Sequence, residues 1–330
     1  MKKIISVSRR TDIPAFYKDW FKKRLGAGFA GWENPFGGQK YLVSLKPQDV
    51  TAFVFWSKNY RPFLDILPDL KQNGFNCLFQ YTITSLPREF EVNLVETEDA
   101  IDSFKEISSI FSAEQVFWRY DPILTFAQTD KEYHLDRFEY IARQLSGYTK
   151  MCFVSFAVFY GKVERNFRAF TKEQGIKFYD PSSEQKIELA NQLADIAAQY
   201  GMQVYTCCGD YLIGEKVKKA HCIDGDLISQ LFYDRELKVK SRPTRKECGC
   251  SESTDIGKYD TCPHGCIYCY ANINKTKARQ MHASHDPESP FLGYGKEDGD
   301  EFVAEIEKNR GSQGQNKSKS KMHQLKLPGL

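Results

Sequence analysis

The chain has 330 residues, a length that suits one sizeable α/β domain with appendages or two small domains. Apolar residues make up 41% and aromatic residues 14%, which supports a substantial core, and a net charge of +3 is too small to indicate nucleic-acid binding by itself. No run of 18 apolar residues occurs, and Arg9 and Arg10 interrupt the apolar start, so we expect no membrane span, no secretion signal and a cytoplasmic protein.

Six short runs of apolar, β-branched and aromatic residues predict β-strands. Their near-continuous hydrophobicity suits strands that are buried on both faces of a parallel sheet. The runs lie at residues 3–8, 52–56, 77–83, 115–119, 151–157 and 202–206. Helical patterns lie between them, at about residues 14–27, 61–73, 97–111, 130–146 and 184–200. This alternation predicts a parallel α/β fold, either a partial TIM-type barrel of about six βα units or an open doubly wound sheet. Because no G-x-G-x-x-G follows the first strand, a dinucleotide-binding sheet is the less favoured option.

Three regions of the sequence differ in character. Residues 1–237 hold the predicted barrel-like domain, with a β-hairpin inserted at 30–45 and one more short helix within 221–237. Residues 238–295 form a Cys-rich segment that we expect to bind a metal and to pack on the barrel. Residues 296–330 are polar, and we expect this tail to be largely disordered.

The Cys-rich segment contains a compact group of three thiols, Cys262, Cys266 and Cys269. Five of the ten cysteines of the chain fall within 22 residues, which in a cytosolic protein favours metal ligation over disulfides. Three thiolates can hold three corners of a [4Fe–4S] cube and leave the fourth iron open. The alternative is a zinc site that uses these three residues with Cys248 or Cys250 as the fourth ligand.

The other cysteines have weaker signals. Cys248 and Cys250 could ligate a second metal, act as redox thiols or simply form a turn. Cys207 and Cys208 are adjacent at a predicted strand end, where we expect at most one of them to face the site. Three further cysteines are expected to be buried structural residues, Cys77, Cys152 and Cys222. Within the loop itself, we expect His264 to be an exposed turn residue.

Polar residues follow the predicted strands at the edge where a parallel α/β fold places its active site. The candidates are Arg9, Arg10, Asp12, Lys58, Arg119 and Asp121. Their arginines and lysine would form a cationic mouth that can hold carboxylate or phosphate groups. Structural roles are the alternative: Asp12 as a helix cap, Arg119 paired with Asp121, and Lys58 in solvent.

The spacing Cys-x3-Cys-x2-Cys, with Tyr268 before and Tyr270 after the last cysteine, resembles the signature of radical S-adenosylmethionine (SAM) enzymes, and most of all the spore photoproduct lyase branch. The resemblance implies a [4Fe–4S] cluster on the three cysteines, with SAM on the open iron and a 5′-deoxyadenosyl radical after one-electron reduction. It also implies lyase, transferase or oxidoreductase chemistry, cofactor contacts from Tyr268 and Tyr270, and an electron donor such as flavodoxin or ferredoxin. The substrate would be a small molecule, anionic or nucleic-acid-derived.

Residues 1 to about 295 also resemble a bacterial family, domain of unknown function 1848. The marks of this family lie at residues 6–14, 34–36, 54–59, 119–122, 262–269 and 285–290. In radical SAM enzymes the cysteine loop follows the first strand of a six-stranded partial barrel, whereas here it follows the predicted barrel. The loop therefore either folds back over the strand ends in a permuted arrangement or has a coincidental spacing. A non-catalytic module, in which zinc or a saturated cluster staples the C-terminal segment to the barrel, is the alternative function.

Overall fold

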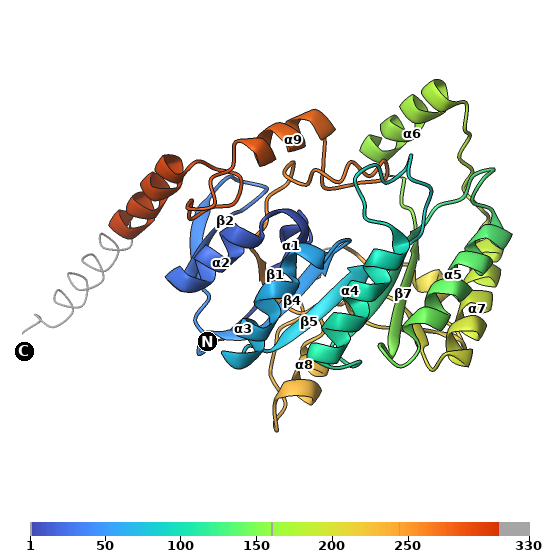
Figure 1. Cartoon of the computed structure of the whole chain (residues 1–330), viewed down its shortest axis with the longest axis horizontal. Helices are drawn as coiled ribbons and strands as arrows, with labels where there is room; N and C mark the ends of the chain where they lie inside the picture. The colour runs from blue at the N-terminus through green and yellow to red at the C-terminus, as the bar shows by residue number, and fades with distance from the viewer. Residues whose placement is uncertain (1, 160, 244, 310–330) are drawn as a thin grey trace, which may run out of the picture.

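A parallel β-sheet forms the centre of the computed structural model, which describes residues 2–159, 161–243 and 245–309 (Figure 1). In spatial order, its eight strands are β10 (Ser253–Asp255), β1 (Lys3–Val7), β4 (Val50–Ser57), β5 (Cys77–Thr82), β6 (Val116–Ile123), β7 (Met151–Phe156), β8 (Gln203–Thr206) and β9 (Val217–Lys219). All seven neighbouring pairs are parallel. The sheet is open, with β9 and β10 as its edges.

The predicted parallel α/β fold is therefore confirmed as an open sheet, and all six predicted strands are present. β9 and β10 were not predicted. Each has only three residues, and neither shows the apolar run that marks the other strands.

Helices connect the strands, and most of them cover one face of the sheet (Figure 1). They are α1 (Ile13–Phe16), α2 (Lys18–Ala27), the 3₁₀ helix η1 (Arg61–Ile66), α3 (Leu67–Gln72), α4 (Thr97–Ile110), α5 (Lys131–Leu145), α6 (Gly161–Gln174) and α7 (Ser183–Gln199). The 3₁₀ helix η2 (Asp210–Leu212), α8 (Gly225–Phe232) and α9 (Lys275–Ala283) follow. The predicted hairpin is also present, as β2 (Phe29–Glu33) paired antiparallel with β3 (Lys40–Ser44).

Both faces of the sheet are buried because side chains alternate along each strand. On β4, Phe53 and Phe55 face the layer that contains helices α2 and η1. Val54, between them, belongs to a second apolar cluster on the opposite face, which we call the inner face. Residues 220–239, including α8, pack there against the sheet. This two-sided burial explains why the strands are hydrophobic along nearly their whole length.

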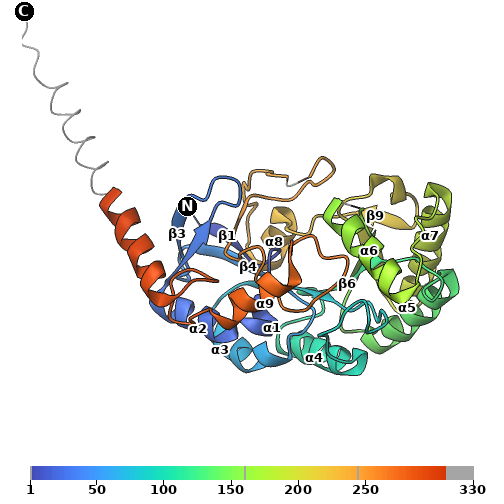
Figure 2. The same ribbon diagram turned by 90° about the horizontal axis from the view of Figure 1, so that it is seen from above.

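The C-terminal part of the chain returns to the beginning of the fold. From β10, which pairs with β1, it crosses the end of the sheet and reaches α9 (Figure 2). The ring of His282 on α9 contacts Phe16 on α1, with the centroids 5.6 Å apart. In the tail predicted to be largely disordered, residues 296–309 form a helix, and residues 310–330 lie outside the described residues.

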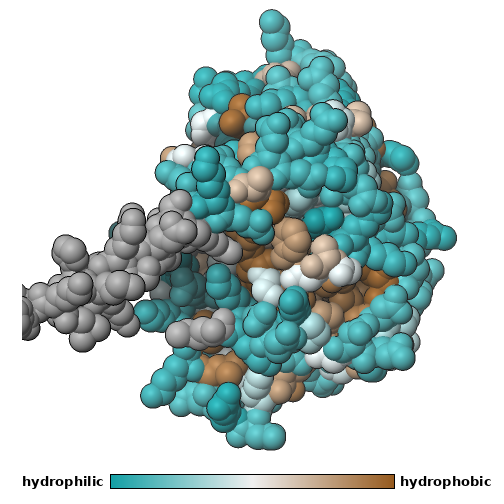
Figure 3. Space-filling view, turned by 90° about the vertical axis from the view of Figure 1, so that its left-hand side faces the viewer, coloured by the Kyte–Doolittle hydropathy of each residue, from teal (hydrophilic) through white to brown (hydrophobic). Residues whose placement is uncertain are grey.

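One face of the surface is mostly hydrophilic, with hydrophobic residues gathered toward its middle (Figure 3). None of the helices in the described ranges combines the length and the apolar character that crossing a bilayer requires.

Candidate functional site

Asp255, at the end of β10, anchors the Cys-rich segment to β1. It is buried, and its carboxylate accepts hydrogen bonds from Ser6 Oγ at 2.8 Å, Ser8 Oγ at 2.5 Å and the backbone N–H of Arg9 at 2.9 Å. Arg9 Nε and Arg10 Nε lie 3.7 and 4.0 Å from it. Burial alone would raise the pKa of Asp255, but the two guanidinium groups and these hydrogen bonds lower it, so the carboxylate is held as an anion.

The cysteine loop, residues 262–269, follows β10 and lies over the carboxyl ends of the strands. Three asparagine side chains donate hydrogen bonds to its backbone carbonyls: Asn93 to Pro263 at 2.8 Å, Asn166 to Ile267 at 2.9 Å and Asn272 to Cys262 at 2.6 Å. The turn needs a left-handed residue, and Gly265 supplies it with φ of 77°. These three amides hold the main chain of the loop in place.

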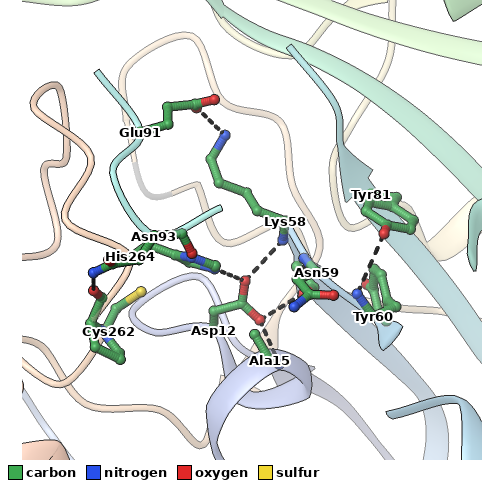
Figure 4. A network of polar contacts seen from close by, with 12 residues as sticks. Asp12, Ala15, Lys58, Asn59, Tyr60, Tyr81, Glu91, Asn93, Cys262 and His264 are labelled. Atoms are coloured by element: carbon green, nitrogen blue, oxygen red, sulfur yellow. Dashed lines mark hydrogen bonds and ion pairs between the residues drawn. The ribbon is translucent and has the colours of Figure 1, made fainter. Parts of the chain in front are cut away.

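His264 connects the loop to Asp12 (Figure 4). Its Nε2 lies 2.7 Å from Asp12 Oδ2, and its side chain is buried, so the prediction of an exposed turn residue is wrong. Asp12 also accepts hydrogen bonds from Ala15 N at 3.0 Å, Ser57 Oγ at 2.7 Å and Lys58 N at 2.8 Å. The prediction of Asp12 as a helix cap is confirmed, and the same carboxylate joins α1, β4 and the loop.

Lys58 and Glu91 form a partly buried ion pair beside the loop (Figure 4). Lys58 Nζ lies 2.7 Å from Glu91 Oε1, and the hydroxyl of Tyr268 donates to the same carboxylate. Burial opposes the charge of Lys58, yet Glu91 and Cys266 raise its pKa above the ordinary value. Lys58 is therefore not in solvent but is a fixed cation that faces both a carboxylate and a thiol of the loop.

The three loop thiols lie close enough to influence one another electrostatically. Burial raises the pKa of all three, and it raises that of Cys266 to about 12 although the cation of Lys58 opposes this. In the described ranges, groups of three ligand atoms that are all within 4.8 Å of one another occur only around Cys207, so at least one pair of the loop sulfurs is farther apart than that.

Arg119 and Asp121 lie two residues apart on β6. They pair directly with each other, which was one of the two predicted alternatives. Arg119 also donates from Nη1 to Gln80 Oε1 at 3.1 Å and lies 3.4 Å from Cys222 Sγ, on the inner face of the sheet. Each predicted cation thus has a carboxylate within 4.0 Å. The strand ends carry a network of paired charges rather than a cationic mouth.

Tyr270 attaches the end of the loop to β1. Its hydroxyl donates to the carbonyl oxygen of Arg9 at 2.8 Å, while part of its ring is exposed. Burial raises the pKa of this phenol, so it stays protonated and remains a hydrogen-bond donor at neutral pH.

A cavity of about 180 Å³ opens beside Lys58 and Glu91. It is lined by the residues that follow β5 and by the first turn of α4, including Thr84, Ser85 and Thr97. Glu91 was not predicted from the sequence, because it lies in an irregular segment with no motif around it.

A second group of thiols lies on the inner face. Cys207, Cys222 and Cys250 form one set whose sulfurs are all within 4.8 Å of one another, and Cys207, Cys208 and Cys248 form another. Cys207 and Cys208 both contribute sulfurs to this group, whereas at most one of them was expected to face the strand-end site; β8 ends at Thr206, so strand alternation does not extend to them. Cys222, expected to be a buried structural residue, also belongs to this group. The sequence gives no signal for this, because β9, which precedes Cys222, shows no strand pattern.

These features define a class: a parallel α/β protein whose C-terminal thiol loop is docked on the strand ends. The chain belongs to the family described as domain of unknown function (DUF1848), which matches residues 4–271. No curated protein matches the chain.

Proposed function

We propose that this protein is an iron–sulfur enzyme of radical SAM type. Cys262, Cys266 and Cys269 would hold a [4Fe–4S] cluster, and SAM would bind the open iron. When bound, these two groups supply one-electron chemistry, while the protein supplies binding and orientation.

The observation that carries this proposal is the position of β10 in the sheet. Starting from β10, the spatial order is the cysteine-loop strand followed by the other seven strands in chain order. Joining the ends of the chain and opening it before β10 would place the loop after the first strand, as in the radical SAM enzymes that the motif resembles. The structure therefore supports a permuted arrangement rather than a coincidental spacing.

The donor set suits a cluster better than a single ion. Around one tetrahedral Zn²⁺ with Zn–S bonds of about 2.3 Å, the sulfurs would be about 3.8 Å apart. At least one pair of the loop sulfurs is farther apart than this, and a [4Fe–4S] cube, in which each cysteine binds a different iron, needs a wider spacing than one ion does. Because the loop is buried against α6 and the segment after β5, through Ile267, Phe90 and Phe170, the site excludes water on that side.

The side chains beside the loop have defined roles in this proposal. Lys58, paired with Glu91, offsets the negative charge of the thiolates, and Glu91 fixes Tyr268 through its hydroxyl. Asp12 holds the loop through His264. The cavity beside Lys58 would accept part of the cofactor or of a small substrate. An anionic substrate would bind to Arg9, Arg10 or Arg119 by exchanging with a carboxylate partner.

The alternative function, in which a metal only holds the C-terminal segment on the sheet, is less favoured by the structure. The strand pairing of β10, the Asp255 network and the three asparagine amides already fix the Cys-rich segment without a metal. A metal in the loop is therefore available for chemistry.

Anaerobic reconstitution tests the proposal. We expect about four irons and four sulfides bound through the loop, and cleavage of SAM to 5′-deoxyadenosine when a strong reductant is added. Cys262→Ala should abolish both, whereas Cys77→Ala, a buried thiol on the helix-covered face of β5, should change neither. Iron uptake without SAM cleavage in the reduced protein would reject the radical function and leave a cluster protein.

A further inference from the structure

Five cysteines from three separate segments meet on the inner face, away from the loop. They are Cys207 and Cys208 after β8, Cys222 after β9, and Cys248 and Cys250 before β10. Cys207 belongs to both sets of sulfurs, and its Sγ lies 3.8 Å from that of Cys250. Neither the sequence motif nor the family match assigns a role to this convergence.

The spacing of these sulfurs is that of ligands around one ion. A tetrahedral site with metal–sulfur bonds of about 2.3 Å has ligand sulfurs about 3.8 Å apart, which is the separation of Cys207 and Cys250. A disulfide would need about 2.05 Å. Cys207 therefore belongs to two overlapping groups of three thiols, each of single-ion size, and a fourth thiol from the other group would close a tetrahedron.

The surroundings are arranged to offset negative charge. Four thiolates with one divalent ion leave two negative charges on the site. Arg119 Nη1 lies 3.4 Å from Cys222 Sγ, and Lys219 donates from Nζ to the carbonyl oxygen of Cys207 at 2.8 Å. Arg9 interacts electrostatically with both Cys222 and Cys250. These three cations also pair with Asp121, Asp210 and Asp255, and they lie where they can offset the remaining charge of a thiolate-held ion.

We propose that these cysteines form a second metal centre, a closed structural site for one zinc-type ion. Cys207, Cys222 and Cys250 supply three ligands, and Cys208 or Cys248 supplies the fourth. The ion joins the ends of β8 and β9 to the segment that leads into β10, and so holds residues 220–239, Cys248 and Cys250 on the inner face. The centre is distinct from the cysteine loop: Arg9 lies between them, facing Cys222 and Cys250 while its carbonyl oxygen accepts from Tyr270.

Metal analysis of a full-length variant that lacks the loop thiols tests this proposal independently of the proposed function. In Cys262→Ala/Cys266→Ala/Cys269→Ala we expect about one zinc per chain and neither iron nor sulfide. Adding Cys207→Ala should reduce the zinc at least about tenfold, because Cys207 is shared by both sets. Adding Cys152→Ala, a buried thiol on the opposite face of the sheet, should leave it unchanged.

The fourth ligand gives a sharper expectation. Cys208→Ala and Cys248→Ala should each retain the ion, because either thiol can replace the other, whereas the double variant should lose it. Cobalt substitution should give the visible absorption of a tetrahedral thiolate site. Absence of metal from the folded loop variant, an iron–sulfur cluster in it, two ions per chain or an octahedral cobalt spectrum would each overturn the proposal.

The wild-type protein provides a second measurement in case the Cys207 variant does not fold. Addition of a strong zinc chelator should accelerate the alkylation of Cys207, Cys222 and Cys250. It should not accelerate the alkylation of Cys77 or Cys152. Peptide mass analysis measures the rate at each thiol. Equal acceleration at all five of these thiols, no acceleration at any, or recovery of Cys207 disulfide-bonded to Cys250 would contradict a metal centre.

Discussion

Asp12 shows how one side chain can join distant parts of the chain. Its carboxylate caps α1, accepts two hydrogen bonds from the end of β4 and holds His264 of the cysteine loop. Asp12 and His264 are separated by 252 residues, and both are buried. A buried carboxylate with this many donors is costly to remove, because the donors lose their partner and cannot reach water.

Replacing Asp12 should therefore destabilise the protein much more than the loss of an ordinary helix cap. We expect Asp12→Ala to lower the free energy of unfolding by about 3 kcal/mol or more, measured by denaturant titration of the metal-free protein. Asp12→Asn, which keeps one acceptor for the cap, should cost less than the alanine variant.

The matched control is Ser182→Ala, which removes the capping box of α7 and should cost only about 1 kcal/mol. If Asp12→Ala cost no more than this control, Asp12 would be a cap only, and its contact with His264 would contribute nothing to stability.

For single residues, the sequence predicts which side chains belong to the site better than it predicts which contacts they make. The loop cysteines, Asp12 and Lys58 could be chosen because each stands at a strand end or in a recognisable motif. The contacts of His264 and Glu91 could not be predicted, since both depend on segments that meet only in the folded chain. The convergence of the inner cysteines could not be predicted for the same reason, although Cys248 and Cys250 were candidate ligands of a second metal. Cys207, Cys222 and Cys250 come from separate segments and meet through the sheet topology.

Among the elements, β10 has the largest influence relative to its length. It contributes three residues to the edge of the sheet, and the cysteine loop follows it directly. Its sequence, Ser253-Thr254-Asp255, has no apolar pattern, so it could not be predicted as a strand. It forms because β1 offers an open edge and because Ser6, Ser8, Arg9 and Arg10 together satisfy Asp255. The six longer strands could be predicted because burial on both faces leaves a hydrophobic run in the sequence.

Asp255→Asn should loosen β10 and the loop together. The variant removes the charge that pairs with Arg9 and Arg10, which leaves two partly buried guanidinium groups without that carboxylate. By hydrogen exchange we expect faster exchange over residues 253–272 and unchanged protection in β5, β6 and β7. Glu252→Gln is the control, because Glu252 forms only an exposed pair with Arg242 and should have little effect. Unchanged exchange after Asp255→Asn would show that strand pairing alone holds the loop.

For the whole molecule, acid stability depends on buried neutral histidines. His134 on α5 is fully buried between Tyr120 of β6, whose hydroxyl donates to its Nδ1, and the carbonyl oxygen of Leu124. Burial lowers its pKa to about 4, against an ordinary value of 6.5. Between these values the unfolded chain binds a proton that the folded chain does not. Stability is therefore unaffected by this group above pH 6.5 and decreases as the pH falls toward 4.

The expected loss from His134 is about 3 kcal/mol between pH 7 and pH 4, measured as the free energy of unfolding across that range. His134→Gln should reduce this pH dependence, although it also lowers stability at neutral pH. His285, whose pKa burial also lowers to about 4, would account for part of the dependence that is left. An identical pH slope in the wild type and the variant would mean that His134 is protonated in the native state as readily as in the unfolded chain.

The pairing of β10 with β1 has a consequence for biosynthesis. Ser6 and Asp255 are 249 residues apart, so at about 5–20 residues per second a ribosome needs roughly 12–50 s to deliver the strand that covers the edge of β1. During that interval the nascent chain exposes an unpaired strand edge, which is a template for aggregation and a target for chaperones. A metal or cofactor on the cysteine loop could be inserted only after translation has passed this point.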